Sequence, residues 1–141
     1  MFRMVLLALA LMVSLPASGY AAGPAAAVKV GEPLNIGFVL YTLGDTPGTL
    51  KARWNYANAY SGPGVATGGP GTGGFVGRFH VRYFLENDQF SDEYDLEIAR
   101  HTPGDFYDVT WLVDDKVSAR GVGMEVAEGQ SLAVGWRRVG E

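Results

Sequence analysis

The sequence predicts an all-β fold, a single antiparallel up-and-down β-barrel of about eight strands. Short strand-like segments follow one another from Asn35 to Arg138, and a turn rich in Gly, Pro or Asp closes each of them. No stretch of helical periodicity separates these segments, and short strands at this spacing are typical of a meander or barrel. Such a barrel can be filled by side chains, or it can hold one small ligand.

The first residues are typical of an export signal. Arg3 precedes an apolar run at residues 4–16 that is too short to span a bilayer comfortably, and small residues follow it. We therefore expect three parts, a signal peptide, a flexible leader and a β-barrel domain, over residues 1–22, 23–33 and 34–141. The mature protein would begin between Ala21 and Gly23, be periplasmic or secreted, and have no stable membrane anchor.

The composition excludes several classes of protein. The chain contains no Cys, which excludes disulfides and a lipid-anchored lipoprotein. Loss of Arg3 with the signal peptide changes the net charge from −4 to −5, and a mildly acidic surface argues against a nucleic-acid or anionic-membrane partner. The 17 aromatic residues (7 Phe, 7 Tyr and 3 Trp) indicate a packed domain despite the 20 Gly and 7 Pro.

Three strands and a long loop are expected first. Residues 36–41, 49–56 and 64–67 form the strands, and one face of the second is apolar: Leu50, Ala52, Trp54 and Tyr56. The loop at residues 68–74 holds five Gly, but it lacks the Gly-Lys-Ser/Thr and the following helix of a phosphate-binding loop. This loop is either a passive connector or a mobile lid over a bound molecule.

Residues 75–84 and 93–98 predict a hairpin with two different faces. Apolar residues alternate with charged ones in both segments. Pairing Phe84 with Glu93 places Arg82 opposite Asp95, and it also places His80 opposite Glu97. Opposite charges then meet on the solvent face, while aromatic and aliphatic residues meet on the inner face.

The last three strands carry the clearest alternation. Tyr107, Val109 and Trp111 are expected to point inward from the sixth strand. If Val113 pairs with Val117, these three side chains face small residues of the seventh strand: Gly123, Gly121 and Ala119. Glycines opposite large rings leave room for those rings inside a narrow barrel. The eighth strand follows the turn at residues 127–130 and carries Leu132, Val134 and Trp136 on its inner face.

No catalytic or metal-binding constellation is expected, and no cofactor. His80 is assigned to an outer strand face and His101 to a turn, so neither fits a nucleophile–base pair. The lack of Cys and of a close His pair argues against zinc. Four acidic residues at one hairpin tip lack the spacing of a calcium loop: Glu86, Asp88, Asp92 and Glu93. Three more carboxylates belong to the charged outer face rather than to a glycosidase pair: Asp95, Glu97 and Asp108.

Five inward-facing aromatic residues are the candidate ligand-binding residues: Trp54, Tyr83, Tyr107, Trp111 and Trp136. Buried Trp and Tyr side chains usually find a partner for their N–H or O–H group, and in a barrel that partner can be a ligand. The alternative is that the rings only fill a cavity-free core. The sequence thus indicates a non-catalytic module whose partner is a small apolar ligand or a protein.

Three short motifs resemble those of small exported bacterial proteins, some of which carry a fibronectin-binding label: Gly104-Asp105-x-Tyr107-x-Val109-Thr110-Trp111, Gly121-x-Gly123 and Leu132-Ala133-Val134-Gly135-Trp136. The meander is also similar to avidin-like and lipocalin-like barrels, and Trp54-Asn55-Tyr56 after Gly48-Thr49 resembles the first strand of avidins. The resemblance implies an exported binding or adhesion module of this barrel type. It does not extend to the polar biotin contacts of avidins, so it implies no biotin binding.

Overall fold

The computed structural model describes residues 34–140. The expected signal peptide and leader, over residues 1–22 and 23–33, lie outside the described residues. Within residues 34–140 the chain forms eight strands and no helix: β1 (Gly37–Leu43), β2 (Leu50–Tyr56), β3 (Tyr60–Thr67), β4 (Gly77–Phe84), β5 (Phe90–His101), β6 (Phe106–Val113), β7 (Lys116–Val126) and β8 (Ser131–Arg138). It follows that this part contains no helix able to cross a membrane.

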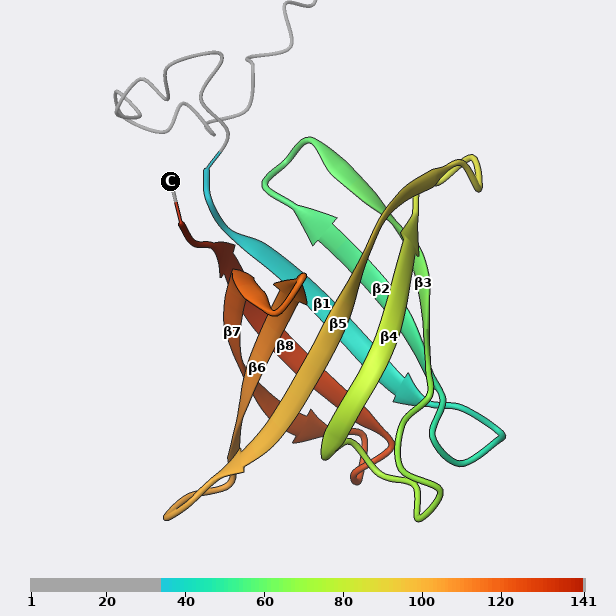
Figure 1. Cartoon of the computed structure of the whole chain (residues 1–141), viewed down its shortest axis with the longest axis vertical. Helices are drawn as coiled ribbons and strands as arrows, with labels where there is room; N and C mark the ends of the chain where they lie inside the picture. Colours follow the sequence, from blue (N-terminus) through green and yellow to red (C-terminus); the bar gives the residue numbers. More distant parts are fainter. Residues whose placement is uncertain (1–33, 141) are drawn as a thin grey trace, which may run out of the picture. The chain divides into compact units, whose positions relative to one another are not determined.

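The eight strands form a closed antiparallel barrel, which confirms the predicted fold class (Figure 1). Each strand pairs with its neighbour in sequence, and β8 closes the sheet against β1 through pairs such as Val39 with Val134. The alternation within each strand directs one face inward, and the inward residues form one continuous core. Closure removes the free sheet edges that would otherwise expose unpaired backbone groups.

Two strands begin earlier than the sequence indicated. Strand β3 begins at Tyr60 rather than at residue 64, and its inward positions include Gly62, Gly64 and Ala66. Small inward residues and a Pro conceal the alternation that identifies a strand. Strand β5 begins at Phe90 rather than at residue 93, and it runs on to His101.

The early start of β5 changes the register of the β4–β5 hairpin. Arg82 pairs with Glu93 and His80 with Asp95, so the predicted partners are wrong by two residues. The assignment of faces is confirmed, because a shift of two residues leaves each side chain on its own side. The turn is shorter than expected, and a bulge between Tyr83 and Phe84 lets the Phe84 ring meet the Phe90 ring.

The β6–β7 pairing is the one that the sequence predicts. Trp111 lies opposite Ala119, and Val109 lies opposite Gly121. The exception is Val113, which pairs with Lys116 because a bulge follows Trp111. Large side chains of β6 therefore lie beside the smallest residues of β7, as the narrow interior requires.

The two ends of the barrel differ. At one end, which we call the closed end, the loop at residues 68–74 lies against the loop between β1 and β2. The Gly69 amide donates a hydrogen bond to the Gly48 carbonyl over 3.0 Å. Phe75, expected within a strand, instead lies between this loop and the start of β4, with its side chain buried. The opposite end, which we call the open end, holds the turns after β2, β4 and β6 and the end of β8 (Figure 1).

The outer wall has two contrasting surfaces. Charged side chains cover β4 and β5, where Arg78 bridges Asp95 at 3.0 Å and Glu97 at 3.1 Å. These pairs are exposed, so each contributes little to stability. On β7, β8 and β1, apolar side chains face solvent, and we call this surface the outer apolar face: Phe38, Leu40, Val122 and Met124. Ala133 and Gly135 of β8 lie between them in the sheet.

Candidate functional site

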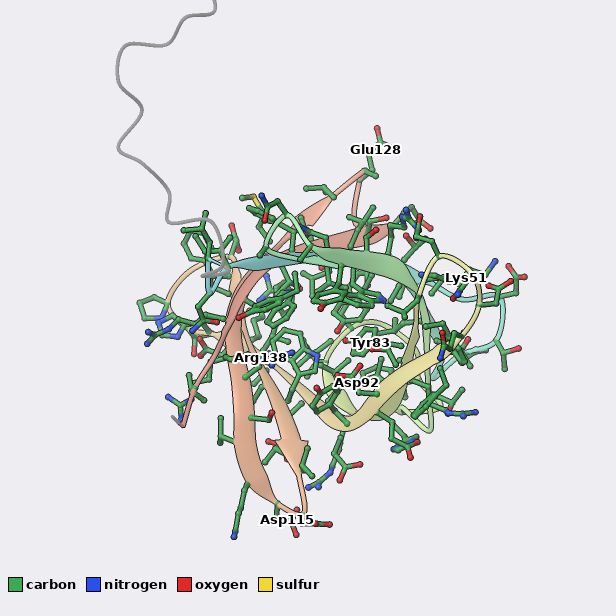
Figure 2. The ribbon with its side chains drawn as sticks, turned by 90° about the horizontal axis from the view of Figure 1, so that it is seen from above. Lys51, Tyr83, Asp92, Asp115, Glu128 and Arg138 are labelled. Carbon is green, nitrogen blue, oxygen red and sulfur yellow. The ribbon has the colours of Figure 1, made fainter. Side chains whose placement is uncertain are left out.

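The candidate site is a cavity of about 1140 Å³ in the open end of the barrel. Six large aromatic side chains line its inner part: Trp54, Tyr56, Tyr83, Tyr94, Trp111 and Trp136. Figure 2 shows the molecule from above, turned by 90° from the view of Figure 1. In this view Tyr83 and Asp92 lie in the middle of the ring of strands. Lys51, Asp115 and Glu128 lie at its periphery in the same view.

Small residues on neighbouring strands make room for these rings. Trp136 pairs with Gly37 on one side and Gly121 on the other. A Cβ atom added to Gly37 would lie 2.2 Å from the Trp136 ring, so only Gly fits there. Tyr83 similarly lies against Gly64, where an added Cβ would be 2.8 Å from the Tyr83 ring. The sequence thus places its largest residues next to its smallest ones at this end of the barrel.

The rings form two runs of stacked, tilted and edge-to-face contacts. Tyr56 stacks on Trp136 with ring centres 5.2 Å apart, and Trp136 lies 5.9 Å from Trp111. On the other side, Tyr83 lies 5.8 Å from Trp54 and 6.1 Å from Tyr94. These separations fall within the range that aromatic pairs favour. Together, the two runs form an aromatic wall around the cavity.

Hydrogen bonds fix the orientation of these rings. Trp54 Nε1 donates to the backbone carbonyls of Pro63, at 3.1 Å, and Phe84, at 3.0 Å. Trp111 Nε1 donates to the Tyr83 hydroxyl over 2.8 Å, which links the two runs of rings. The Tyr83 hydroxyl also contacts the Tyr41 hydroxyl, at 2.5 Å. The cavity wall is therefore held in place before any ligand arrives, which lowers the cost of binding.

Burial dominates the acid–base behaviour of the two linked tyrosines. It raises the pKa of Tyr41 well above the usual value, with the neighbouring Tyr83 as a second cause. Burial likewise raises the pKa of Tyr83. Both hydroxyls are therefore neutral at physiological pH.

We expect the free energy of unfolding to fall steeply above about pH 10, where tyrosines of the unfolded chain ionise. Because the folded-state pKa values of Tyr41 and Tyr83 are raised, their stabilising contribution is complete below that pH. It is lost as the pH rises through the folded-state values. Urea unfolding at a series of pH values measures the effect, and the fall should be shallower in Tyr41→Phe. Equal slopes in the variant and the wild type would contradict this account.

Polar groups gather at the rim of the cavity. The Tyr94 hydroxyl donates a hydrogen bond to the Asp92 carboxylate. Burial, and after it this hydrogen bond to Asp92, raise the pKa of Tyr94. The Arg138 guanidinium lies 4.6 Å from the centre of the Tyr56 ring, in cation–π geometry. A bound molecule would therefore meet aromatic surface inside and charged groups at the entrance.

The structure brings together four of the five candidate residues named from the sequence: Trp54, Tyr83, Trp111 and Trp136. The fifth, Tyr107, is not among the residues that line this cavity. It points inward as expected, but it lies near the closed end, where its hydroxyl donates to Glu125 over 2.6 Å. This hydrogen bond, with burial as the second cause, raises the pKa of Tyr107. The sequence pattern indicates whether a side chain points into or out of the barrel, but not its position along the barrel axis.

The Gly-rich loop at residues 68–74 does not lie over the cavity. It joins the ends of β3 and β4 that carry Thr67 and Gly77, whereas the cavity is lined by the opposite ends, at Tyr60 and Tyr83. Of the two alternatives for this loop, its position therefore rules out a lid over this cavity and agrees with a connector across the closed end.

Sequence reasoning missed several residues of the site. Tyr56 and Tyr94 were already assigned to inner strand faces, and their position at the open ends of these strands was the signal that could have identified them. Asp92 was assigned to a solvated hairpin tip, but it lies within β5 because that strand begins earlier than expected. No pattern in the sequence indicated that Tyr41 reaches the Tyr83 hydroxyl, because the two residues are 42 positions apart.

The residues weighed for catalysis or metal binding lie elsewhere. His80 contacts Glu93 at 2.9 Å on the charged outer face, and His101 contacts Asp108 at 3.1 Å. Among residues 34–140, no group of three His, Asp or Glu side chains is arranged to hold a metal ion. Searches against family models, curated proteins and solved structures find no match for this chain.

Proposed function

We propose that the protein is an exported, non-catalytic binding module that holds one small apolar or aromatic ligand in the open end of its barrel. The observation that carries this proposal is the cavity of about 1140 Å³ lined by eight aromatic residues, of which Tyr60 and Phe90 are exposed. Export is proposed from the order of charge, apolar run and small residues at the start of the sequence.

The size and lining of the cavity suit such a ligand. Ligand pockets in proteins usually measure about 300–1,000 Å³ and are lined mainly by apolar and aromatic side chains. The cavity of about 1140 Å³ is slightly larger than that range, and part of it is the funnel between the rim residues. The aromatic lining offers apolar surface to a planar molecule, and the water displaced from it favours binding.

A titration with N-phenyl-1-naphthylamine, a planar neutral probe, tests the proposal through the probe's own fluorescence. We expect saturable binding of about one probe per chain. Trp136→Ala should weaken it about 30-fold, because truncating an anchoring Trp typically costs about 2 kcal/mol or more. Phe106→Ala is the matched control, since Phe106 is exposed on the outer wall of β6. Shortening the loop at residues 68–74 should leave binding unchanged.

The second candidate is a protein-interaction module, for example one of the adhesion type. The outer apolar face favours it, because contiguous exposed apolar surface often marks a site of protein interaction. Two rows of this face run across the sheet, from Met124 through Ala133 to Leu40 and from Val122 through Gly135 to Phe38. This candidate would be favoured over ligand binding inside the barrel if the probe does not bind saturably. It would also be favoured if Trp136→Ala and Phe106→Ala weaken probe binding equally.

A further inference from the structure

Three buried polar groups meet on the inner side of the cavity. Trp111 is 3% exposed, Tyr83 is 6% exposed and Tyr41 is 0% exposed. The Trp111 N–H and the two hydroxyls are joined by the contacts of 2.8 Å and 2.5 Å described above. Trp111 and Tyr83 line the cavity, whereas Tyr41 lies behind them.

The number of hydrogens in this cluster exceeds the number of hydrogen bonds. Trp111 contributes one N–H and can only donate, while each tyrosine contributes one O–H and can also accept. Three donor hydrogens are therefore available, but only two hydrogen bonds form, one from Trp111 to Tyr83 and one between the two hydroxyls. The Trp111 N–H is also close to the Tyr41 hydroxyl, but it is a donor and adds no acceptor to the cluster. No other side chain or carbonyl among residues 34–140 is hydrogen-bonded to either hydroxyl. One hydroxyl hydrogen in the cluster is left without an acceptor.

Burial decides which hydroxyl keeps the free hydrogen. If Tyr83 donated to Tyr41, the Tyr41 hydrogen would be left unpaired at a position that no solvent reaches. A buried donor without an acceptor incurs its full desolvation penalty. If Tyr41 donates to Tyr83 instead, the Tyr83 oxygen accepts two hydrogen bonds, which uses both of its lone pairs. The free hydrogen then belongs to Tyr83, which borders the cavity.

We propose that Tyr83 is the inner hydrogen-bond donor of the site, and that the ligand carries a neutral acceptor, a carbonyl oxygen, directed at its hydroxyl. This inference rests on the proposed function. A second donor on the ligand would find no lone pair at Tyr83, so the geometry selects an acceptor. A neutral acceptor suits the site better than a carboxylate, because the Asp92 carboxylate is close to Tyr83 and would repel a second negative charge there.

Two probes of the same ring skeleton test the proposal. 9-Fluorenone has a ring carbonyl where fluorene has a methylene group, and both can be measured by displacement of N-phenyl-1-naphthylamine. We expect the wild-type protein to bind fluorenone about five- to tenfold more tightly than fluorene, which is the effect of one net hydrogen bond. In Tyr83→Phe, the two probes should bind within about twofold of each other.

Tyr41→Phe is the matched variant that separates the two hydrogen arrangements. If the Tyr83 hydrogen already faces the cavity, the preference for fluorenone persists in Tyr41→Phe. If Tyr83 instead donates to Tyr41, the preference appears only after Tyr41 loses its oxygen, and the proposal is overturned. This comparison still decides the question if Tyr83→Phe fails to fold.

A measurement without ligand provides an independent check. With tyrosine labelled at the ring carbon that bears the hydroxyl, nuclear magnetic resonance in mixed H₂O and D₂O reports the exchange of each hydroxyl hydrogen. We expect the Tyr83 hydrogen to exchange faster than the Tyr41 hydrogen, and the reverse order overturns the assignment.

In the probe experiment, failure of both fluorenone and fluorene to bind would overturn the proposed function, that the barrel holds a ligand. Equal binding of the two probes would leave the proposed ligand binding intact and overturn the donor role of Tyr83.

Discussion

Replacement of Trp111 by Ala is expected to lower the free energy of unfolding by about 3–5 kcal/mol, the usual range for deleting a buried aromatic side chain. The ring is 3% exposed and belongs to the core cluster. Its loss would remove apolar contacts and leave a cavity, because the surrounding barrel wall can collapse only partly. The indole N–H would be lost as well, which removes the hydrogen bond to Tyr83.

Two further variants separate these contributions to the effect of Trp111→Ala. Trp111→Phe keeps much of the apolar volume but removes the N–H donor, so we expect an intermediate loss of stability. Phe106→Ala changes an aromatic residue of the same strand whose side chain is 53% exposed, and it should shift stability by no more than about 0.5 kcal/mol. Urea unfolding measures all three variants. A loss below about 1 kcal/mol for Trp111→Ala would show that the ring is not a core anchor.

Replacement of Gly121 by Ala is expected to lower the free energy of unfolding by about 1–3 kcal/mol, as overpacking of a filled core usually does. An added Cβ would lie 2.5 Å from the Gly135 carbonyl oxygen and 2.9 Å from a Val134 methyl group. The backbone oxygen belongs to the neighbouring strand β8, so relief of the contact requires the two strands to move apart. The same movement would disturb Trp136, which pairs with Gly121.

Gly71→Ala is the matched control for this substitution. An added Cβ at Gly71 would meet nothing within 4 Å, and its φ angle is not in the left-handed region. Stability should be unchanged or rise by up to about 1 kcal/mol, because Ala restricts the unfolded chain more than Gly does. Equal effects of the two substitutions would show that Gly121 is not constrained by the neighbouring strand.

The sequence was most informative about strand register where the large residues of one strand match the small residues of its neighbour. The pairing of Trp111 with Ala119 and of Val109 with Gly121 was predicted because a short turn after Val113 places the large side chains of one strand beside the small residues of the next. Between β4 and β5, several registers satisfy the same division into charged and apolar faces, and turn length selects among them. The turn was shorter than expected, which moved Arg82 from Asp95 to Glu93.

The sequence predicted which types of residue form the candidate site, but not where along the barrel axis the site lies. A period of two separates inward from outward side chains, yet it does not distinguish Trp111 in the cavity wall from Tyr107 near the closed end. For a similar reason, the sequence could not decide between a lid and a connector for residues 68–74. Loops on successive hairpins alternate between the two ends of an antiparallel barrel, and the cavity is at the other end.

The resemblance to avidin-like and lipocalin-like barrels stays a prediction at the level of family. What the structure adds is the division of the interior. Core residues such as Phe79 and Leu132 fill the part near the closed end, and aromatic rings surround a cavity near the open end. The two alternatives that the sequence left open, a filled barrel and a hollow one, therefore apply to different parts of the same molecule.

The central claim is that the open end of the barrel receives a ligand, and nuclear magnetic resonance with ¹⁵N-labelled protein tests it most directly. The three indole N–H signals, from Trp54, Trp111 and Trp136, serve as reporters during titration with N-phenyl-1-naphthylamine. We expect all three to shift and to saturate together at one probe per chain, while the backbone amides of Phe38 and Val122 remain unchanged. Shifts confined to those outer amides, with the indole signals unmoved, would contradict the account.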